Sequence, residues 1–363
     1  MSIPNDLVSR AFRNPDGLGG FSLTDWDTLI RQARSAGLLA RLRHMLEQGG
    51  QLDSIPMVAR WHFDAAATLA ARQQIAINWE IDKIVEALAE LGSPFIVLKG
   101  AAYVIADLPA ACGRLFNDID ILVPRELIES VEGALMLAGW HPGGLSSYDQ
   151  RYYRRWMHEI PPMQHIERAT VLDVHHAILP DTARCHPDSA KLRSRAMNVK
   201  ASRNLQVLAP EDMLLHSATH LFHDGELAHG LRDLTDLDLL FRHFAREQDF
   251  WFKLAARARE LGLSRSLFYA VRYVKYFLAT PIPESFEHTL QEASPNRATL
   301  ALMDAMFTRA LAPAHPSCKD SFTSLARKAA YIRAHWLRMP PHLLFPHLFH
   351  KAFFEPRYDP QTT

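Results

Sequence analysis

Hydrophobic and polar residues follow two different patterns along the chain. Residues 24–48 and about 56–91 place apolar side chains at the 3.6-residue period of a helix, and Gly49 and Gly92 stand where each pattern stops. The same period returns from about residue 205 and continues toward the C-terminus. These patterns predict helical regions on both sides of a central stretch of a different kind.

Short apolar runs bounded by glycine or proline occupy that central stretch. The run 95–100, FIVLKG, predicts a buried strand that enters a turn, and GRLFNDIDILVP at 113–124 predicts a second strand closed by proline. Two further runs, 163–166 and 170–178, are joined by the tripeptide ERA, which is typical of a hairpin. The helices predicted between these strands are 101–107 and 125–138.

These elements predict an α+β fold in which a small mixed or antiparallel sheet is flanked by helices, so that the chain is mostly α overall. Three parts are expected: a helical N-terminal region at 1–92, an α/β core at 93–200 and a helical C-terminal domain at 201–363. The length of 363 residues suits two or three domains or one elaborated domain.

The composition limits the classes of binding partner and the cellular compartments to be expected. The 40 basic and 40 acidic residues cancel, so net charge gives no reason to expect nucleic acid or an anionic membrane as a partner. Cys112, Cys185 and Cys318 lie far apart, which argues against a disulfide framework or a cysteine-rich zinc site and suits a reducing compartment. The N-terminus lacks the apolar segment of a signal peptide, and no run approaches the ~18 apolar residues of a membrane span. We therefore expect a soluble cytoplasmic protein.

Two aspartates open the strand predicted within 113–124. Because residues two apart in a strand face the same way, Asp118 and Asp120 share one face, while the opposite face is wholly apolar. Two close carboxylates repel each other unless a cation lies between them. Mg²⁺ would remove this conflict, since it prefers oxygen ligands and commonly binds one or two carboxylates together with phosphates. A solvated strand end is the simpler alternative.

Other residues of the core favour the same chemistry. Gly100 and Ala101 stand at the predicted strand-to-helix turn, where small residues let backbone N–H groups approach a phosphate; an ordinary turn is the alternative. Asp173 stands mid-strand between apolar neighbours, where an unpaired carboxylate is costly, so a metal is a natural partner. A salt-bridged or exposed aspartate would explain that position equally well. His175 shares the strand face of Asp173 and is either a site residue or a structural hydrogen-bond partner.

The helical histidines favour a different kind of metal site. His216, His220 and His223 are spaced to share one helix face, which would suit the zinc site of a metal hydrolase. No HExxH motif is present, and histidines at this spacing are more often core residues with hydrogen-bond partners.

The order strand, glycine turn, helix, D-x-D strand, helix and hairpin with a third aspartate resembles the polymerase-beta-like nucleotidyltransferase superfamily. More closely, LKGAAYVIADLPAACGRLFNDIDILVP at 98–124, LDVHHAIL at 172–179 and the helical sequence at 209–241 resemble a bacterial family described only as uncharacterised nucleotidyltransferases. The resemblance spans about 60–330 and implies that 93–200 is a nucleotidyltransferase core.

The resemblance implies a role for each candidate residue. Asp118 and Asp120 would bind the metals that bridge the triphosphate, and Asp173 would hold the catalytic metal and help to activate the attacking hydroxyl. Arg114 matches an arginine typical of the family, and its forked guanidinium would contact the nucleotide or brace the acids. His175 would belong to the nucleotide-binding side of the site. The helical residues that would lie near the acceptor or the nucleotide are His220, His223, Arg232 and Asp236.

The implied phosphate-binding turn departs from the superfamily pattern at one position. Many superfamily members carry Gly-Ser there, with the serine hydroxyl on a phosphate, whereas this chain has Gly100-Ala101. The backbone amide remains, and the neighbouring Lys99 would add positive charge for a phosphate.

The implied function is metal-dependent transfer of a nucleoside monophosphate from an NTP to an acceptor hydroxyl, with release of pyrophosphate. Two ions, Mg²⁺ or Mn²⁺, some 3.5–4 Å apart would clamp the attacking and leaving oxygens. The acceptor is an unidentified small molecule or protein hydroxyl, and nucleic acid is not expected as a partner. Two alternatives stay open: a non-catalytic nucleotide- or partner-binding module on the same fold, and a metal hydrolase that uses the helical histidines.

Overall fold

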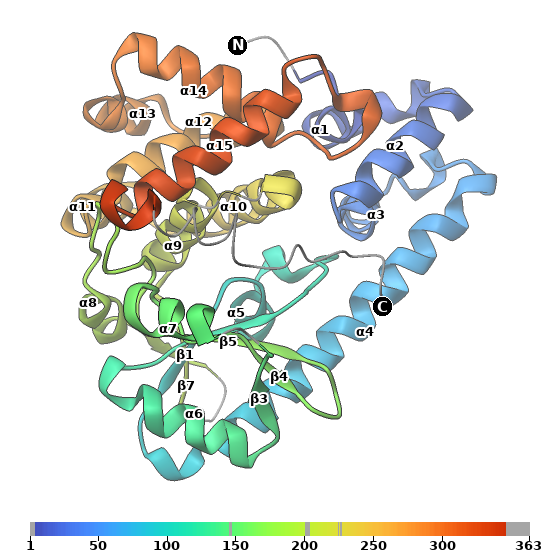
Figure 1. Ribbon diagram of the computed structural model, residues 1–363. Coiled ribbons are helices and arrows are strands. Elements are labelled where there is room, and N and C mark those ends of the chain that lie inside the picture. Colours follow the sequence, from blue (N-terminus) through green and yellow to red (C-terminus); the bar gives the residue numbers. More distant parts are fainter. Residues whose placement is uncertain (1–3, 145–146, 200–203, 224, 226, 346–363) are drawn as a thin grey trace.

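One mixed sheet runs through the middle of the chain (Figure 1). The computed structural model describes residues 4–144, 147–199, 204–223, 225 and 227–345. The strands, in chain order, are β1 (Phe95–Leu98), β2 (Ile119–Leu122), β3 (Trp140–Pro142), β4 (Met163–His165), β5 (Val171–His175), β6 (Met197–Asn198) and β7 (Leu205–Val207).

The strands are ordered β3-β4-β5-β2-β1-β7-β6 across the sheet. β2 is antiparallel to β1 on one side and parallel to β5 on the other, while β4 and β5 form the expected antiparallel hairpin. Every residue of β1 and β2 is buried, as their apolar sequences FIVL and IDIL predict for all but one position. That exception is Asp120, a buried carboxylate in a central strand.

Helices make up most of the remaining chain and confirm the expected α+β fold. The α-helices, in chain order, are α1 (Leu7–Arg13), α2 (Leu23–Ser35), α3 (Leu39–Gln48), α4 (Met57–Ala87), α5 (Lys99–Ile105), α6 (Ile128–Leu137), α7 (Ser147–Trp156), α8 (Ser189–Ser194), α9 (Pro210–His223), α10 (Gly230–Phe244), α11 (Phe250–Glu260), α12 (Ser264–Leu278), α13 (Glu284–Leu290), α14 (Arg297–Ala310) and α15 (Thr323–Arg338). Within the described part of the chain, none of them combines the length and the apolar character that crossing a membrane requires.

Two of the predicted helical patterns differ in detail from the structure. The pattern at 24–48 is split into α2 and α3, because Gly37 adopts a left-handed φ of 68° that interrupts the helix. The pattern at 56–91 forms α4, which ends at Ala87 and is followed by a 3₁₀ turn. The sequence pattern did not predict β7, which lies just beyond residue 200 and pairs in parallel with β1.

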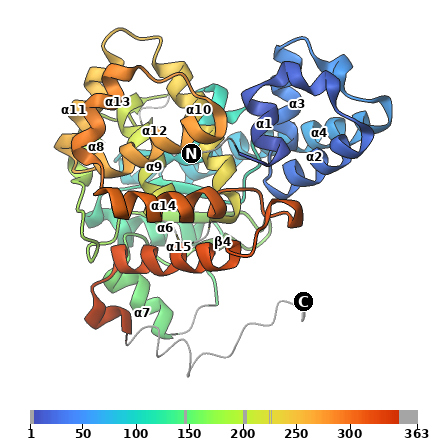
Figure 2. The same cartoon turned by 90° about the horizontal axis from the view of Figure 1, so that it is seen from above.

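The sheet and the two helical groups pack as one body. α4 contacts α3, α5 and α6, whereas α9 contacts α5, α10, α11, α12 and α15. Figure 1 shows the C-terminal helices above the sheet, and Figure 2 shows α1–α4 as a group beside them. α1 packs on α12 and so joins the two helical groups.

A tight turn after α5 connects the core to the N-terminal helices. Gly113 has a left-handed φ of 64°, and a Cβ atom there would lie 2.5 Å from the backbone nitrogen of Arg41 in α3. Only glycine permits this close approach. The turn therefore places Arg114, the next residue, where it can meet the same partner as Arg41.

Candidate active site

The pairing of β2 with β5 sets two of the predicted acids side by side. The strands are parallel neighbours, and Asp120 stands opposite Asp173 in their register. Asp118 comes immediately before β2 and faces the same way as Asp120, and its charge acts on Asp173. The structure thus brings Asp118, Asp120 and Asp173 to one place on the sheet.

Asp120 is the most buried of the three acids and has two donors. Lys99 Nζ lies 2.7 Å from Asp120 Oδ1, and His175 Nε2 lies 3.0 Å from the same oxygen. Burial alone would raise the pKa of Asp120, but Lys99 and His175 outweigh it and hold that pKa well below its usual value. Asp120 is therefore ionised, and because a carboxylate only accepts hydrogen bonds, His175 Nε2 carries a proton.

Lys99 and Gly100 form an unusual start to α5. Lys99 has a φ of 47°, a left-handed conformation that costs a residue with a Cβ atom about 1 kcal/mol or more. A Cβ atom on Gly100 would lie 2.1 Å from Nη1 of Arg114. A side chain at Gly100 would therefore require the Arg114 guanidinium to move, and the neighbouring Ala101 is buried.

Asp173 and Asp118 lack the compensation that Asp120 receives. Asp173 Oδ1 is buried and has no hydrogen-bond partner among the described residues. Burial, followed by the charges of Asp120 and Glu159, raises the pKa of Asp173 to about 7. Desolvation and then the charge of Asp120 also raise the pKa of Asp118. Ionisation of both Asp118 and Asp173 is therefore disfavoured unless a further cation lies nearby.

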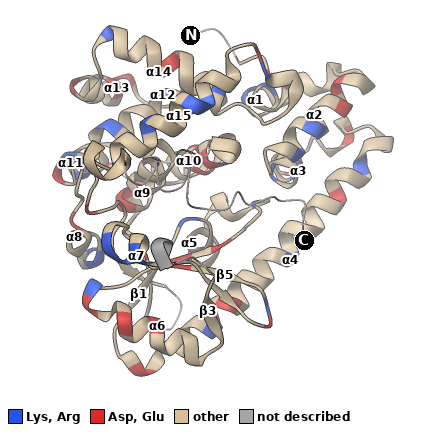
Figure 3. Cartoon of the chain, in the orientation of Figure 1, with Lys and Arg blue, Asp and Glu red and all other residues tan. Residues whose placement is uncertain are grey.

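A polar cleft of about 270 Å³ opens beside Asp118 and Asp120, and Asp173 is not among its lining residues. Its walls come from β2, the start of α5 and the helices α9 and α10. The lining residues are Lys99, Gly100, Tyr103, Arg114, Asn117, Asp118, Asp120, Ser217, His220, His229, Arg232, Asp233 and Asp236. Figure 3 shows acidic and basic residues interspersed over the described helices, in keeping with the zero net charge.

Arg114 braces an acid, but not one of the three on the sheet. Its Nε lies 2.8 Å from Asp236 Oδ2, and Nη1 of Arg41 lies 2.6 Å from Asp236 Oδ1. All three residues are buried. Burial would raise the pKa of Asp236, but the two guanidinium groups outweigh it and lower that pKa. Asp236 is thus an ionised carboxylate shared by two arginines in one wall of the cleft.

The helical histidines do not gather around a common point. His220 lines the cleft, whereas His223 bonds the backbone oxygen of Thr219 through Nδ1. Burial lowers the pKa of His216 to about 3 and that of His223 to about 4, and it holds the pKa of His220 well below its usual value. All three are therefore neutral. Among the described residues, the side chains close enough to share a metal are His158, Glu159 and His175 instead.

Sequence reasoning missed several residues of the site. Glu159 Oε2 lies 3.2 Å from His175 Nδ1, and His158 stacks beside His175 with ring centroids 5.3 Å apart. Their segment carries no strand alternation and ends in two prolines, so nothing in the sequence indicated that it lies along β5. Tyr103, His229 and Asp233 also went unpredicted as cleft residues.

Asp118, Asp120 and Asp173 offer the donor type that a divalent cation prefers, although their oxygens do not all lie within 4.8 Å of one another as the ligand atoms of His158, Glu159 and His175 do. The donors are carboxylate oxygens, which Mg²⁺ and Mn²⁺ prefer, and Asp173 offers a buried oxygen that accepts no hydrogen bond from the described residues. The cleft beside Asp118 and Asp120 supplies cations for an anionic ligand, Lys99 and Arg232 among them. The residue types therefore suit a metal and a phosphate-bearing molecule, and a cation shared by all three acids would have to draw their oxygens closer together.

A family model described as uncharacterised nucleotidyltransferase matches residues 22–279. That range includes the whole sheet, both helices that wall the cleft and every site residue named above. Comparisons with curated proteins and with solved structures gave no significant match.

We predict that Asp173→Asn stabilises the metal-free protein at neutral and alkaline pH. The pKa of Asp173 is raised from 3.8 to about 7, so the folded state binds this proton more tightly and the free energy of unfolding falls as pH rises between those values. Asparagine does not ionise, so the free energy of unfolding of the variant exceeds that of the wild type by an amount that grows with pH and reaches its full value above about pH 7.

Thermal unfolding midpoints measured across that pH range, with and without Mg²⁺, check this prediction. Mg²⁺ should reduce the difference in unfolding midpoint between Asp173→Asn and the wild type, because only the wild type has the Asp173 carboxylate to bind the ion. Asp181→Asn, which changes an exposed aspartate, serves as the control. A lower midpoint for Asp173→Asn in metal-free alkaline buffer would contradict the prediction.

Proposed function

The chain belongs to the family of uncharacterised nucleotidyltransferases, and from that premise we propose that it transfers a nucleoside monophosphate from an NTP to an acceptor hydroxyl and releases pyrophosphate. The observation that carries this proposal is the group of three acids, in which Asp120 is neutralised while Asp118 and Asp173 are not. A cation would offset the charge that these two acids carry when ionised, and phosphoryl transfer uses a cation in this position.

Asp118, Asp120 and Asp173 would hold Mg²⁺ or Mn²⁺. When bound, the ions would neutralise the charge on the transferring phosphoryl group and on the oxygens that attack and leave. The protein itself would supply positioning: Asp120 is buried in a central strand, and its backbone pairs with β1 and β5. Carboxylates on such a rigid element keep their geometry while the substrate changes.

Lys99 would exchange partners during the reaction. In the structure its ammonium group neutralises Asp120, and burial, which would lower the pKa of Lys99, is outweighed by that acid. Lys99 also lines the cleft, so a cation that replaces it on Asp120 would leave the ammonium group beside the phosphates. Arg232 and His220 on α10 and α9 form the opposite wall, where the acceptor would bind.

The Lys99–Asp120 ion pair also favours the rival proposal, a binding module without turnover. A lysine that neutralises the central acid allows this acid to remain buried with no metal. Asp118 and Asp173 favour the enzyme, because Lys99 and His175 contact Asp120, whereas Asp173 Oδ1 has no hydrogen-bond partner among the described residues. A site retained only for its fold gains nothing from that uncompensated group.

We also propose a cytoplasmic location, which supplies NTP and Mg²⁺. The three cysteines are free and partly buried, in keeping with a reducing compartment.

The transfer reaction is directly testable. Incubating the protein with α-labelled NTPs, Mn²⁺ or Mg²⁺ and candidate small-molecule or protein acceptors should give labelled acceptor and pyrophosphate. Asp118→Asn and Asp173→Asn should each lower the rate by at least about a hundredfold, because each removes a charge from the cation site.

Asp249→Asn is the matched control, since Asp249 is exposed at the start of α11 and asparagine tolerates its left-handed φ of 64°. Label transfer that survives in Asp118→Asn and Asp173→Asn would overturn the assignment of these acids. Nucleotide binding by the wild type without any transfer would favour the binding module.

Lys99→Met should separate metal binding from nucleotide binding. Removing the ammonium group 2.7 Å from Asp120 removes a competitor of the metal, so Mn²⁺ should bind the free protein more tightly. The KM for NTP should rise about tenfold or more, in line with the roughly 1.5–3 kcal/mol of a hydrogen bond to a charged group.

Mn²⁺ titration in the absence of NTP and steady-state kinetics measure the two effects. Lys83→Met, which changes a lysine paired with Glu86 on the surface of α4, is the control. Weaker Mn²⁺ binding with an unchanged KM would show that Lys99 only supports the fold.

A further inference from the structure

We propose that His158, Glu159 and His175 form a second metal site, for a divalent ion of the zinc class, directly behind Asp120. This site differs from the acids of the cleft in its ligands, because it offers two imidazole nitrogens and one carboxylate oxygen. Its binding of metal does not depend on the proposed nucleotidyl transfer, whereas the role suggested for it below rests on that function.

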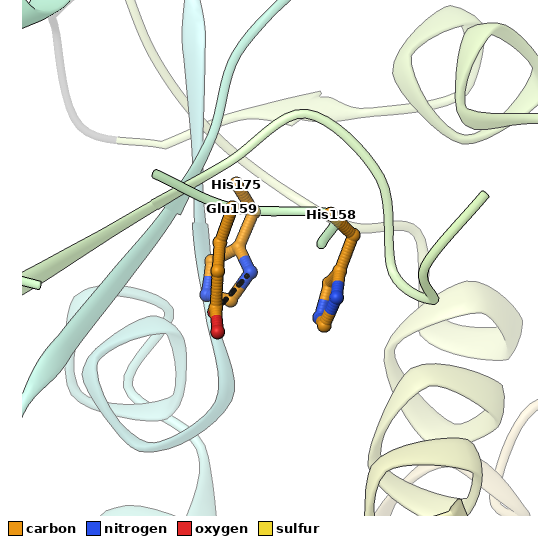
Figure 4. Close-up of side chains that lie close together, drawn as sticks. All are labelled: His158, Glu159 and His175. Atoms are coloured by element: carbon orange, nitrogen blue, oxygen red, sulfur yellow. Dashed lines mark ion pairs between the residues drawn. The ribbon is translucent and has the colours of Figure 1, made fainter. Parts of the chain in front are cut away.

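The three side chains are already close together. One potential ligand atom from each lies within 4.8 Å of the others, and Glu159 Oε2 is 3.2 Å from His175 Nδ1. Figure 4 shows all three side chains extending in the same direction from the backbone, with His158 beside the Glu159–His175 pair. The two imidazole rings are tilted by 34° relative to each other, with their centroids 5.3 Å apart.

The backbone holds these residues on adjacent extended segments. Glu159 and His175 are partners in an antiparallel bridge. The amide of Ile160 donates to the oxygen of Val174 at 3.0 Å, and the amide of His176 donates to the oxygen of His158 at 2.8 Å. Binding therefore requires side-chain rotation alone, and the ligands stand on a rigid element, as a precise metal site needs.

The donor set selects the class of metal. Imidazole nitrogen suits Zn²⁺ and its transition-metal neighbours, whereas Mg²⁺ and Ca²⁺ prefer oxygen ligands alone. With bonds of about 2.0–2.1 Å, two ligands of a tetrahedral zinc are roughly 3.3 Å apart. The Glu159–His175 distance of 3.2 Å matches this value, and a rotation of the His158 ring would close the remaining gap. Two histidines and one glutamate leave a fourth position for water.

His158 distinguishes a metal site from a simple hydrogen-bond chain. Without a metal, His175 can donate from both ring nitrogens, to Glu159 and to Asp120, and is fully satisfied. His158 is not satisfied in that arrangement, because its buried Nδ1 has no hydrogen-bond partner in the described chain. A metal bound by His158, Glu159 and His175 would give this side chain a partner.

The second site would act on the first through one imidazole ring. A metal-binding histidine commonly donates its other ring N–H to a carboxylate, which fixes the ring orientation. Here the metal would take Nδ1 of His175, and Nε2 would keep its proton and its 3.0 Å bond to Asp120. Under the proposed function, the zinc-class ion would thus hold Asp120 in place as a ligand of the catalytic cation.

Metal loading of the full chain tests the site. The purified protein is stripped with a chelator, exposed to Zn²⁺, desalted and analysed for bound metal. We expect about one tightly bound zinc per chain in the wild type. His158→Gln and Glu159→Gln should weaken zinc binding by at least the ~10–100-fold that the loss of an outer-shell partner costs.

His176→Gln is the matched control, because His176 is the next residue on the chain but is not one of the three ligands. Cobalt(II) adds a spectroscopic readout: its visible absorption should report a nitrogen-containing site in the wild type and in His176→Gln, and should be lost in His158→Gln. Circular dichroism confirms that each variant is folded. Equal zinc content in the wild type and His158→Gln would mark the metal as adventitious and overturn the proposal.

Asp118→Asn separates this proposal from the proposed function. It should abolish nucleotidyl transfer and leave zinc content at the wild-type level. If the wild type binds zinc through His158 but transfers no nucleotide, the metal site stands and only the role suggested for it is lost. A protein that transfers nucleotide but fails to retain zinc would overturn the metal site alone.

Discussion

The arrangement of the molecule depends on one buried network of ion pairs, in which Asp236 lies between Arg41 and Arg114. Arg41 belongs to α3, Asp236 to α10 and Arg114 to the turn before β2, and the carboxylate accepts from both guanidinium groups. Removing one partner of a buried ion pair costs on the order of 3–5 kcal/mol, because the remaining charge is left in a medium that cannot solvate it. The N-terminal helices, the sheet and the C-terminal helices are therefore held in one relative position.

The same network sets the geometry of the cleft. The Arg114 guanidinium lies against Gly100 at the start of α5, next to Lys99. Lys99 then reaches Asp120, which also accepts from His175. The outcome is one compensated carboxylate beside two that are not. Under the proposed function, this imbalance would let the site fold without a metal and still attract a cation.

Much of this site follows from local sequence rules, and the rest depends on contacts that local rules do not describe. Strand alternation predicted that Asp118 and Asp120 share a face, and the short apolar runs predicted a mixed sheet. The partner of Arg114 was not predictable, because Asp236 lies 122 residues further along the chain. Glu159 was missed because its segment forms a single bridge to β5 next to two prolines, which gives no periodic signal.

The central claim is that Asp118, Asp120 and Asp173 hold a divalent cation together with a nucleoside triphosphate. A crystal structure of the protein with Mn²⁺ and a non-hydrolysable NTP, recorded at a wavelength where manganese scatters anomalously, tests it most directly. The account predicts manganese bound by oxygens of these three aspartates, phosphates in the cleft and the Lys99 ammonium group moved from Asp120 to the phosphates. Manganese bound elsewhere, with Lys99 still paired to Asp120 in the presence of nucleotide, would contradict it.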